Sequence, residues 1–119
     1  MKRGFTLVEV LVTLVVVTGG MTALLMAFSY ALSTSRNIEE EAAAINIANA
    51  KMEDIRNTTY QSIQNSTEDS SAIISGLTGY TVTTVTTKPA NPAQVSVTVS
   101  WAAKGGTASI ALMTLAADY

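Results

Sequence analysis

Apolar residues are concentrated in the first part of the chain. Between residues 5 and 32 a single charged side chain, Glu9, interrupts them. As an α-helix, which rises about 1.5 Å per residue, this segment would reach about 42 Å. A hydrocarbon core of about 30 Å needs only about 20 residues. The pattern predicts a helix that crosses a membrane and continues beyond it, with Lys2 and Arg3 holding its beginning on the cytoplasmic side.

Two ordinary explanations of this segment compete with a functional one. A cleaved secretory signal peptide has an apolar stretch of about 7–15 residues, which is much shorter than the one here. A plain signal anchor accounts for the length but leaves Glu9 unexplained. Ionisable side chains in membrane-spanning helices are costly, and they are functional candidates where a partner can be named. Glu9 is therefore a candidate site residue.

After residue 33 the apolar positions become periodic. They recur at three- and four-residue steps, which predicts one buried stripe along a helix formed by Ile38, Ala42, Ile45, Ala48, Met52 and Ile55. The acidic run Glu39–Glu41 is expected to be a solvated face, with a contact to a partner subunit as the alternative. No proline precedes Pro89, so residues 33–57 are expected to continue the membrane helix as an amphipathic stalk.

The remainder of the chain changes from loop composition to a period of two. Residues 58–79 are rich in Ser, Thr, Asn and Gly and are expected to form a connecting loop. Valine and threonine then alternate with other residues between turn signals, which predicts strands at 80–87, 95–101 and 107–115. Trp101 is expected to anchor the core. The predicted fold class is α+β: a long N-terminal helix packed against a small antiparallel sheet of about three strands, in the head formed by residues 80–119.

Composition and charge exclude several classes of function. The net charge is −2, and the seven basic residues are scattered, so no cationic stripe is available to neutralise nucleic-acid phosphates. The chain has no cysteine and no histidine, which removes disulfides, thiolate metal sites and the commonest general base. We expect no enzyme activity, no catalytic residue, no metal and no cofactor.

The order of residues at the beginning of the apolar segment carries a resemblance to a known family. The run Arg3-Gly4-Phe5-Thr6-Leu7-Val8-Glu9 resembles the cleavage and methylation motif of type IV prepilins and pseudopilins. In that family a membrane aspartyl peptidase cuts after the glycine and methylates the new N-terminus. The resemblance implies a leader of residues 1–4, cleavage between Gly4 and Phe5, and N-methylation of Phe5. Residues 5–32 would then form the transmembrane and filament-core helix, and the α+β fold would be pilin-like.

The resemblance also gives Glu9 a role, because it becomes the fifth mature residue, the position that the family uses in assembly. A processed subunit carries an ammonium at Phe5 and a carboxylate at Glu9, one helical turn apart. In a filament, Glu9 of one subunit can pair with the Phe5 ammonium of its neighbour. A pairing of buried charges fixes register even where its net stabilisation is small.

Beyond the first thirty residues the resemblance is to small minor subunits. Residues 48–56 with Tyr60, and residues 97–101 with the Gly105-Gly106 turn, resemble minor pilins of the pilus-modification type and minor pseudopilins of type II secretion. We expect a minor type IV pilin that assembles or primes a pilus, with a minor pseudopilin as the alternative. An uncleaved, single-pass surface binding protein is the alternative from another class.

The expected partners are a prepilin peptidase, other pilin or pseudopilin subunits and an inner-membrane assembly platform, with no nucleic acid. The expected location is the bacterial inner membrane, with the N-terminus cytoplasmic and the head outside, and then the filament.

Overall fold

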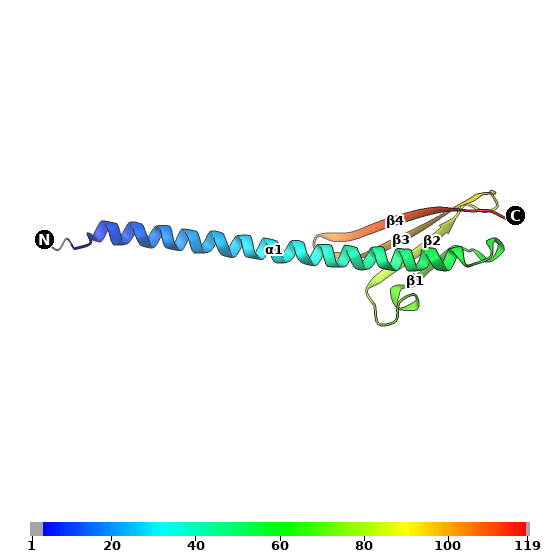
Figure 1. Cartoon of the computed structure of the whole chain (residues 1–119), viewed down its shortest axis with the longest axis horizontal. Coiled ribbons are helices and arrows are strands. Elements are labelled where there is room, and N and C mark those ends of the chain that lie inside the picture. Colours follow the sequence, from blue (N-terminus) through cyan, green and yellow to red (C-terminus); the bar gives the residue numbers. More distant parts are fainter. Residues whose placement is uncertain (1–3, 119) are drawn as a thin grey trace. The chain divides into compact units, whose positions relative to one another are not determined.

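The computed structural model describes residues 4–118, so Lys2 and Arg3, the expected orientation signals, lie outside the described residues. One helix, α1 (Leu7–Arg56), is followed by the 3₁₀ turn η1 (Tyr60–Ser62), strand β1 (Ser66–Asp69) and the turn η2 (Ser70–Ala72) (Figure 1). Strands β2 (Tyr80–Thr86), β3 (Ala93–Ala103) and β4 (Gly106–Ala116) complete the chain. The chain consists of two compact units, an N-terminal unit up to residue 37 and a globular unit from residue 38.

The N-terminal unit is built from the first part of α1, whose leucine, methionine and alanine residues favour a helix. The hydroxyls of Thr13 and Thr18 donate to the carbonyls of Glu9 and Leu14, each at 2.6 Å. Thr22 donates in the same way, to the carbonyl of Thr18 at 3.0 Å. These bonds satisfy the polar groups of the side chains within the helix itself, which is what apolar surroundings require of them.

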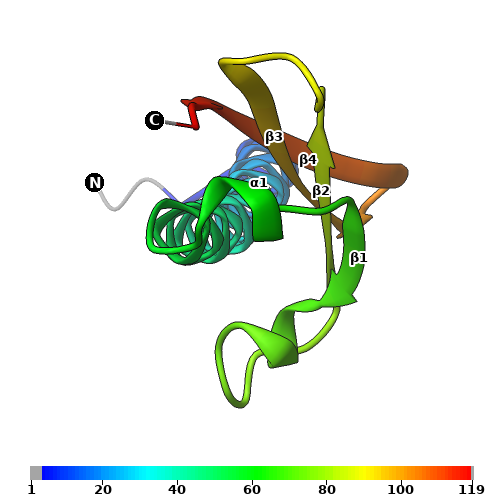
Figure 2. The ribbon, with the colours of Figure 1, turned by 90° about the vertical axis from the view of Figure 1, so that its right-hand side faces the viewer.

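In the globular unit α1 covers one face of the sheet, and the stripe that it buries differs from the predicted one (Figure 2). Ile38 and Ile45, assigned to the buried stripe from their spacing, are 62% and 42% exposed. Apolar residues occupy adjacent positions around this part of the helix, so periodicity alone did not select the face. The residues that the sheet covers are Ala44, Ile47, Ala48, Met52 and Ile55.

The sheet is antiparallel throughout, with the strand order β1-β2-β3-β4. Val95, Val97 and Val99 of β3 are fully buried, and they alternate with partly exposed residues as the period of two predicts. Val82 of β2 is buried beside them. Trp101 is partly buried and packs at the border of this core, with its ring centroid 5.9 Å from that of Tyr80. The α+β, pilin-like architecture predicted from the sequence is thus confirmed.

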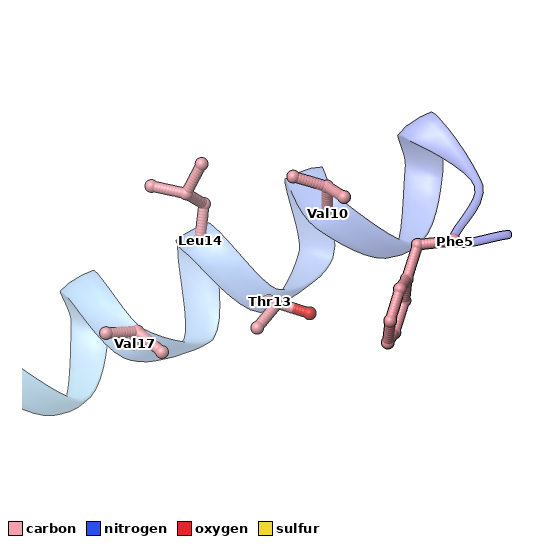
Figure 3. A pocket seen from close by; sticks show the side chains of 5 residues that line it. All are labelled: Phe5, Val10, Thr13, Leu14 and Val17. Atoms are coloured by element: carbon pink, nitrogen blue, oxygen red, sulfur yellow. The ribbon is translucent and has the colours of Figure 1, made fainter.

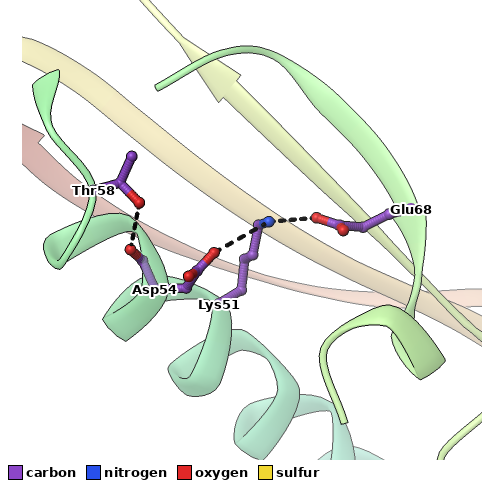
Figure 4. A network of polar contacts seen from close by, with 4 residues as sticks. All are labelled: Lys51, Asp54, Thr58 and Glu68. Carbon is purple, nitrogen blue, oxygen red and sulfur yellow. Dashed lines mark hydrogen bonds and ion pairs between the residues drawn. The ribbon is translucent and has the colours of Figure 1, made fainter. Parts of the chain in front are cut away.

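The number of strands is four rather than about three, because β1 lies within residues 58–79, which were expected to be a loop. Its sequence, Ser-Thr-Glu-Asp, has little intrinsic preference for a strand. Tertiary contacts compensate, since β1 pairs with β2 from Ser66↔Thr84 to Asp69↔Thr81. The Lys51 ammonium of α1 also reaches the Glu68 carboxylate at 2.5 Å (Figure 4).

Near the end of α1, polar contacts join the connection between β2 and β3 to other segments of the globular unit. The side chain of Asn91 donates to the carbonyl of Asp118 at 3.1 Å and accepts from its amide at 3.2 Å. The Lys88 ammonium donates to the carbonyls of Gln61 and Ile63 at 3.0 and 2.6 Å. The connection between β2 and β3 therefore holds both the segment after α1 and the end of the described chain.

Candidate functional site

The beginning of α1 is fixed by the side chain of Thr6. Its hydroxyl accepts a hydrogen bond from the Glu9 amide at 3.2 Å, and its carbonyl accepts one from the Val10 amide at the same distance. Thr6 is thus the N-cap residue and Glu9 the third helical residue, the spacing of a capping box. The negative side chain of Glu9 lies in the first turn, where the helix dipole favours it.

Gly4 and Phe5 precede the helix, and both are exposed. A Cβ atom added to Gly4 would meet no other atom within 4 Å. Packing within the chain therefore gives no reason for a glycine at this position. The reason is to be sought outside the folded subunit, in whatever binds the segment around Gly4 and Phe5.

Beside this segment the helix surface carries an open apolar hollow of about 380 Å³. Figure 3 shows the side chains that line it, which are Phe5, Val10, Thr13, Leu14 and Val17. Glu9 is exposed on the same turns of the helix, and no described residue forms an ion pair with its carboxylate. A carboxylate of this kind on an apolar helix is available to a cation supplied from outside the subunit.

All of the residues from 4 to 32 are exposed. Large apolar side chains such as Leu7, Val15 and Phe28 have 70% or more of their surface accessible. A contiguous apolar surface of this extent marks contact with a membrane or another protein. By its length and composition, α1 is able to cross a membrane.

A comparison with known protein families identifies a motif in this segment. Residues 1–28 match the family model described as the prokaryotic N-terminal methylation motif. This match supports a type IV prepilin- or pseudopilin-type protein. The comparisons found no match among curated proteins and none among solved structures. The motif implies that this prepilin-type protein is a substrate of a prepilin peptidase and a partner of pilin-type subunits.

The structure brings the predicted residues Gly4, Phe5 and Glu9 of this prepilin-type protein into one short segment at the beginning of α1. It adds Thr6, whose capping role the sequence reasoning missed. The signal was present, because a threonine followed three residues later by a glutamate before an apolar run is the sequence pattern of a capping box.

A second polar cluster lies in the globular unit, where Lys51 is placed between Asp54, at 3.7 Å, and Glu68 (Figure 4). The side chains of Lys51 and Glu68 are 14% and 28% exposed. Their pairing connects α1 to β1, so we interpret the cluster as structural. Among the described residues no group of three or more His, Cys, Asp or Glu side chains is placed to hold a metal ion.

Proposed function

We propose that this protein is a minor type IV pilin, a structural subunit without enzymatic activity that takes part in the assembly or priming of a pilus. The N-terminal motif, with a carboxylate at the assembly position, carries the proposal. Its assignment to the minor class is supported by the small globular unit, by the absence of cysteine from the sequence and by the absence of proline before Pro89.

Processing begins with insertion of the apolar segment, with Lys2 and Arg3 on the cytoplasmic side. The peptidase cuts the Gly4–Phe5 bond, which leaves a positively charged amine on Phe5, and methylates that amine. Since no described residue forms an ion pair with the carboxylate of Glu9, this carboxylate is available to a group of another subunit. In the filament it pairs with the Phe5 ammonium of a neighbouring subunit and fixes the axial register of the two helices.

The alternative within the family is a minor pseudopilin of a type II secretion system, which uses the same processing and assembly chemistry. An uncleaved membrane-anchored binding protein is the alternative from another class. Processing separates this last class from the first two, and the phenotype of a deletion separates pilus from secretion. Loss of surface fibres and twitching supports a pilin, whereas loss of export of folded enzymes supports a pseudopilin.

The deciding measurement is the intact mass and N-terminal sequence of the full chain co-expressed with a prepilin peptidase. We expect loss of residues 1–4 and a methylated Phe5. A variant with a bulky residue at the cleavage position, Gly4→Val, is expected to stay uncut, while the exposed substitution Glu39→Gln is expected to leave cleavage unchanged. An uncut wild-type chain, under conditions in which a known prepilin is cut, would reject the proposal.

A further inference from the structure

The hydrogen-bond ladder of α1 begins at Thr6. The Val10 amide donates to the Thr6 carbonyl at 3.2 Å, which is the first bond between residues four apart. One step earlier, the same ladder would join the Glu9 amide to the Phe5 carbonyl. The Glu9 amide donates instead to the Thr6 hydroxyl, also at 3.2 Å. The side chain of Thr6 thus takes the place of the Phe5 carbonyl as acceptor, and α1 begins at Leu7.

The backbone before Thr6 consequently stays outside the helix. Among the described residues, no group donates a hydrogen bond to the carbonyl of Gly4 or to that of Phe5. Gly4 is exposed, and Phe5 is 82% exposed. The peptide bond between these two residues, which is the scissile bond of the proposed function, is therefore accessible from solution.

Cleavage of this bond makes a specific demand on the Gly4 carbonyl. Water adds to its carbon, the bond to the Phe5 nitrogen breaks, and the products are a carboxylate on Gly4 and, after proton transfer, an ammonium on Phe5. Negative charge develops on the Gly4 oxygen in the transition state, so donors of the peptidase must reach that oxygen. In a helix longer by two residues, the Gly4 carbonyl would accept from the Val8 amide instead.

Removal of the Thr6 hydroxyl favours this longer helix. The first amides of a helix lack acceptors within the regular ladder, and amides without acceptors are costly in apolar surroundings. Without the hydroxyl, the acceptors that continue the ladder for the Glu9 and Val8 amides are the carbonyls of Phe5 and Gly4. Their use would enclose the scissile bond in the first turn. Gly4 opposes this extension by its poor helix propensity but offers no other acceptor.

We propose that Thr6 is a positioning residue for cleavage. Its hydroxyl ends α1 at a point that leaves the Gly4–Phe5 bond outside the helix and the Gly4 carbonyl free for the peptidase. Thr6 acts through the backbone of its neighbours and does not contact the reacting atoms. The inference rests on the proposed function, which supplies the peptidase.

The first test measures the initial rate at which a prepilin peptidase removes residues 1–4 from the full chain in membrane vesicles. Thr6→Val keeps the shape of the side chain and removes the hydroxyl, and it is expected to slow cleavage about fivefold, as loss of a typical N-cap would. Thr6→Ser and Thr6→Asn retain a capping group and are expected to be cut near the wild-type rate. The matched control is Thr22→Val, which removes a hydroxyl that donates to the Thr18 carbonyl of the same helix.

The second test examines the uncut full chain in detergent without the peptidase. A Gly-Phe pair occurs once in the sequence, so labelling the glycine carbonyls with ¹³C and the phenylalanine nitrogens with ¹⁵N isolates the NMR signal of the Gly4–Phe5 bond. The chemical shift of this carbonyl reports whether it accepts a helical hydrogen bond. We expect it to move toward the helical value in Thr6→Val and to stay at the wild-type value in Thr6→Ser and Thr6→Asn.

Three results would overturn the role of Thr6: cleavage of Thr6→Val at the wild-type rate, an unchanged Gly4 signal in that variant, or cleavage of Thr6→Asn as slow as that of Thr6→Val. The last result would mean that the peptidase reads the hydroxyl itself. A wild-type chain that stays uncut beside a known prepilin rejects the proposed function, whatever the Gly4 signal. A wild-type chain that is cut no faster than Thr6→Val rejects only the positioning role.

Discussion

Glu9 carries a carboxylate on an apolar helix surface, and its backbone amide and carbonyl form hydrogen bonds with the hydroxyls of Thr6 and Thr13. We expect Glu9→Gln, which keeps the size of the side chain and removes its charge, to leave cleavage and folding of the globular unit intact. Incorporation into filaments is expected to fall about tenfold, which corresponds to about 1.4 kcal/mol. The measurement is the ratio of subunit in sheared filaments to subunit in membranes. Glu39→Gln, on the exposed surface of the same helix, is the control, and normal incorporation of Glu9→Gln would contradict the assembly role.

Asp69 gives a second residue-scale prediction, outside the membrane segment. Hydrogen bonds from the Ser71 side chain and backbone, and from the Gly79 backbone, hold the pKa of Asp69 below its ordinary value of 3.8. A carboxyl whose pKa is lower in the folded protein stabilises the fold above the unfolded pKa, and this stability is lost as the pH falls through the folded pKa. We expect Asp69→Asn to show a smaller loss of thermal stability than wild type below about pH 4, measured by Trp101 fluorescence. An identical pH profile for the two proteins would contradict the prediction.

Between elements, the pair formed by Lys51 and Glu68 joins α1 to β1. Removing one partner leaves a partly buried charge, so Lys51→Met and Glu68→Gln are each expected to lower the free energy of unfolding by about 1–2 kcal/mol, between the effects known for exposed and buried pairs. The double variant is expected to lose less than the sum. Denaturant unfolding of the detergent-solubilised chain, followed by Trp101, measures both quantities. The exposed pair of Glu53 and Arg56, at 3.6 Å, is the matched control and should contribute little.

The elements that the sequence predicted best are those whose pattern has a single solution. Val95, Val97 and Val99 alternate so regularly that only one face of β3 was suited to burial, and the structure buries that face. The apolar segment with Glu9 at its beginning likewise allowed few readings, and the match to the methylation motif supports the family that it suggested.

Elements whose position depends on contacts elsewhere could not be predicted in the same way. The residues of β1 have little strand propensity of their own, and pairing with β2 and the contact with Lys51 make the strand. Ala44 and Ile47 are buried instead of Ile38 and Ile45 because the sheet selects one of several apolar stripes that the sequence of α1 offers. The capping role of Thr6 was not predicted, because the same residues also belong to the cleavage motif.

At the scale of the whole molecule, the two units differ in whether their apolar side chains are buried within the unit itself. In the N-terminal unit residues 4–32 are all exposed, so we expect lipid or neighbouring subunits to cover their apolar side chains. The globular unit buries its own core, and every residue of that core lies between Ala44 and Ala116. Detergent is thus required by the first unit rather than by the second.

This difference predicts the behaviour of truncated chains. A chain beginning at residue 33 keeps all of the core residues, so we expect it to be soluble without detergent, with Trp101 emission and a thermal midpoint close to those of the full chain in detergent. A chain beginning at residue 50 is the control. It loses Ala44, Ile47 and Ala48, and since the loss of one buried isoleucine side chain alone costs about 2–5 kcal/mol, it is expected not to fold. If the chain from residue 33 were unfolded as well, the apolar half of α1 would have to contribute to the stability of the globular unit, and the two units could not be treated as independent.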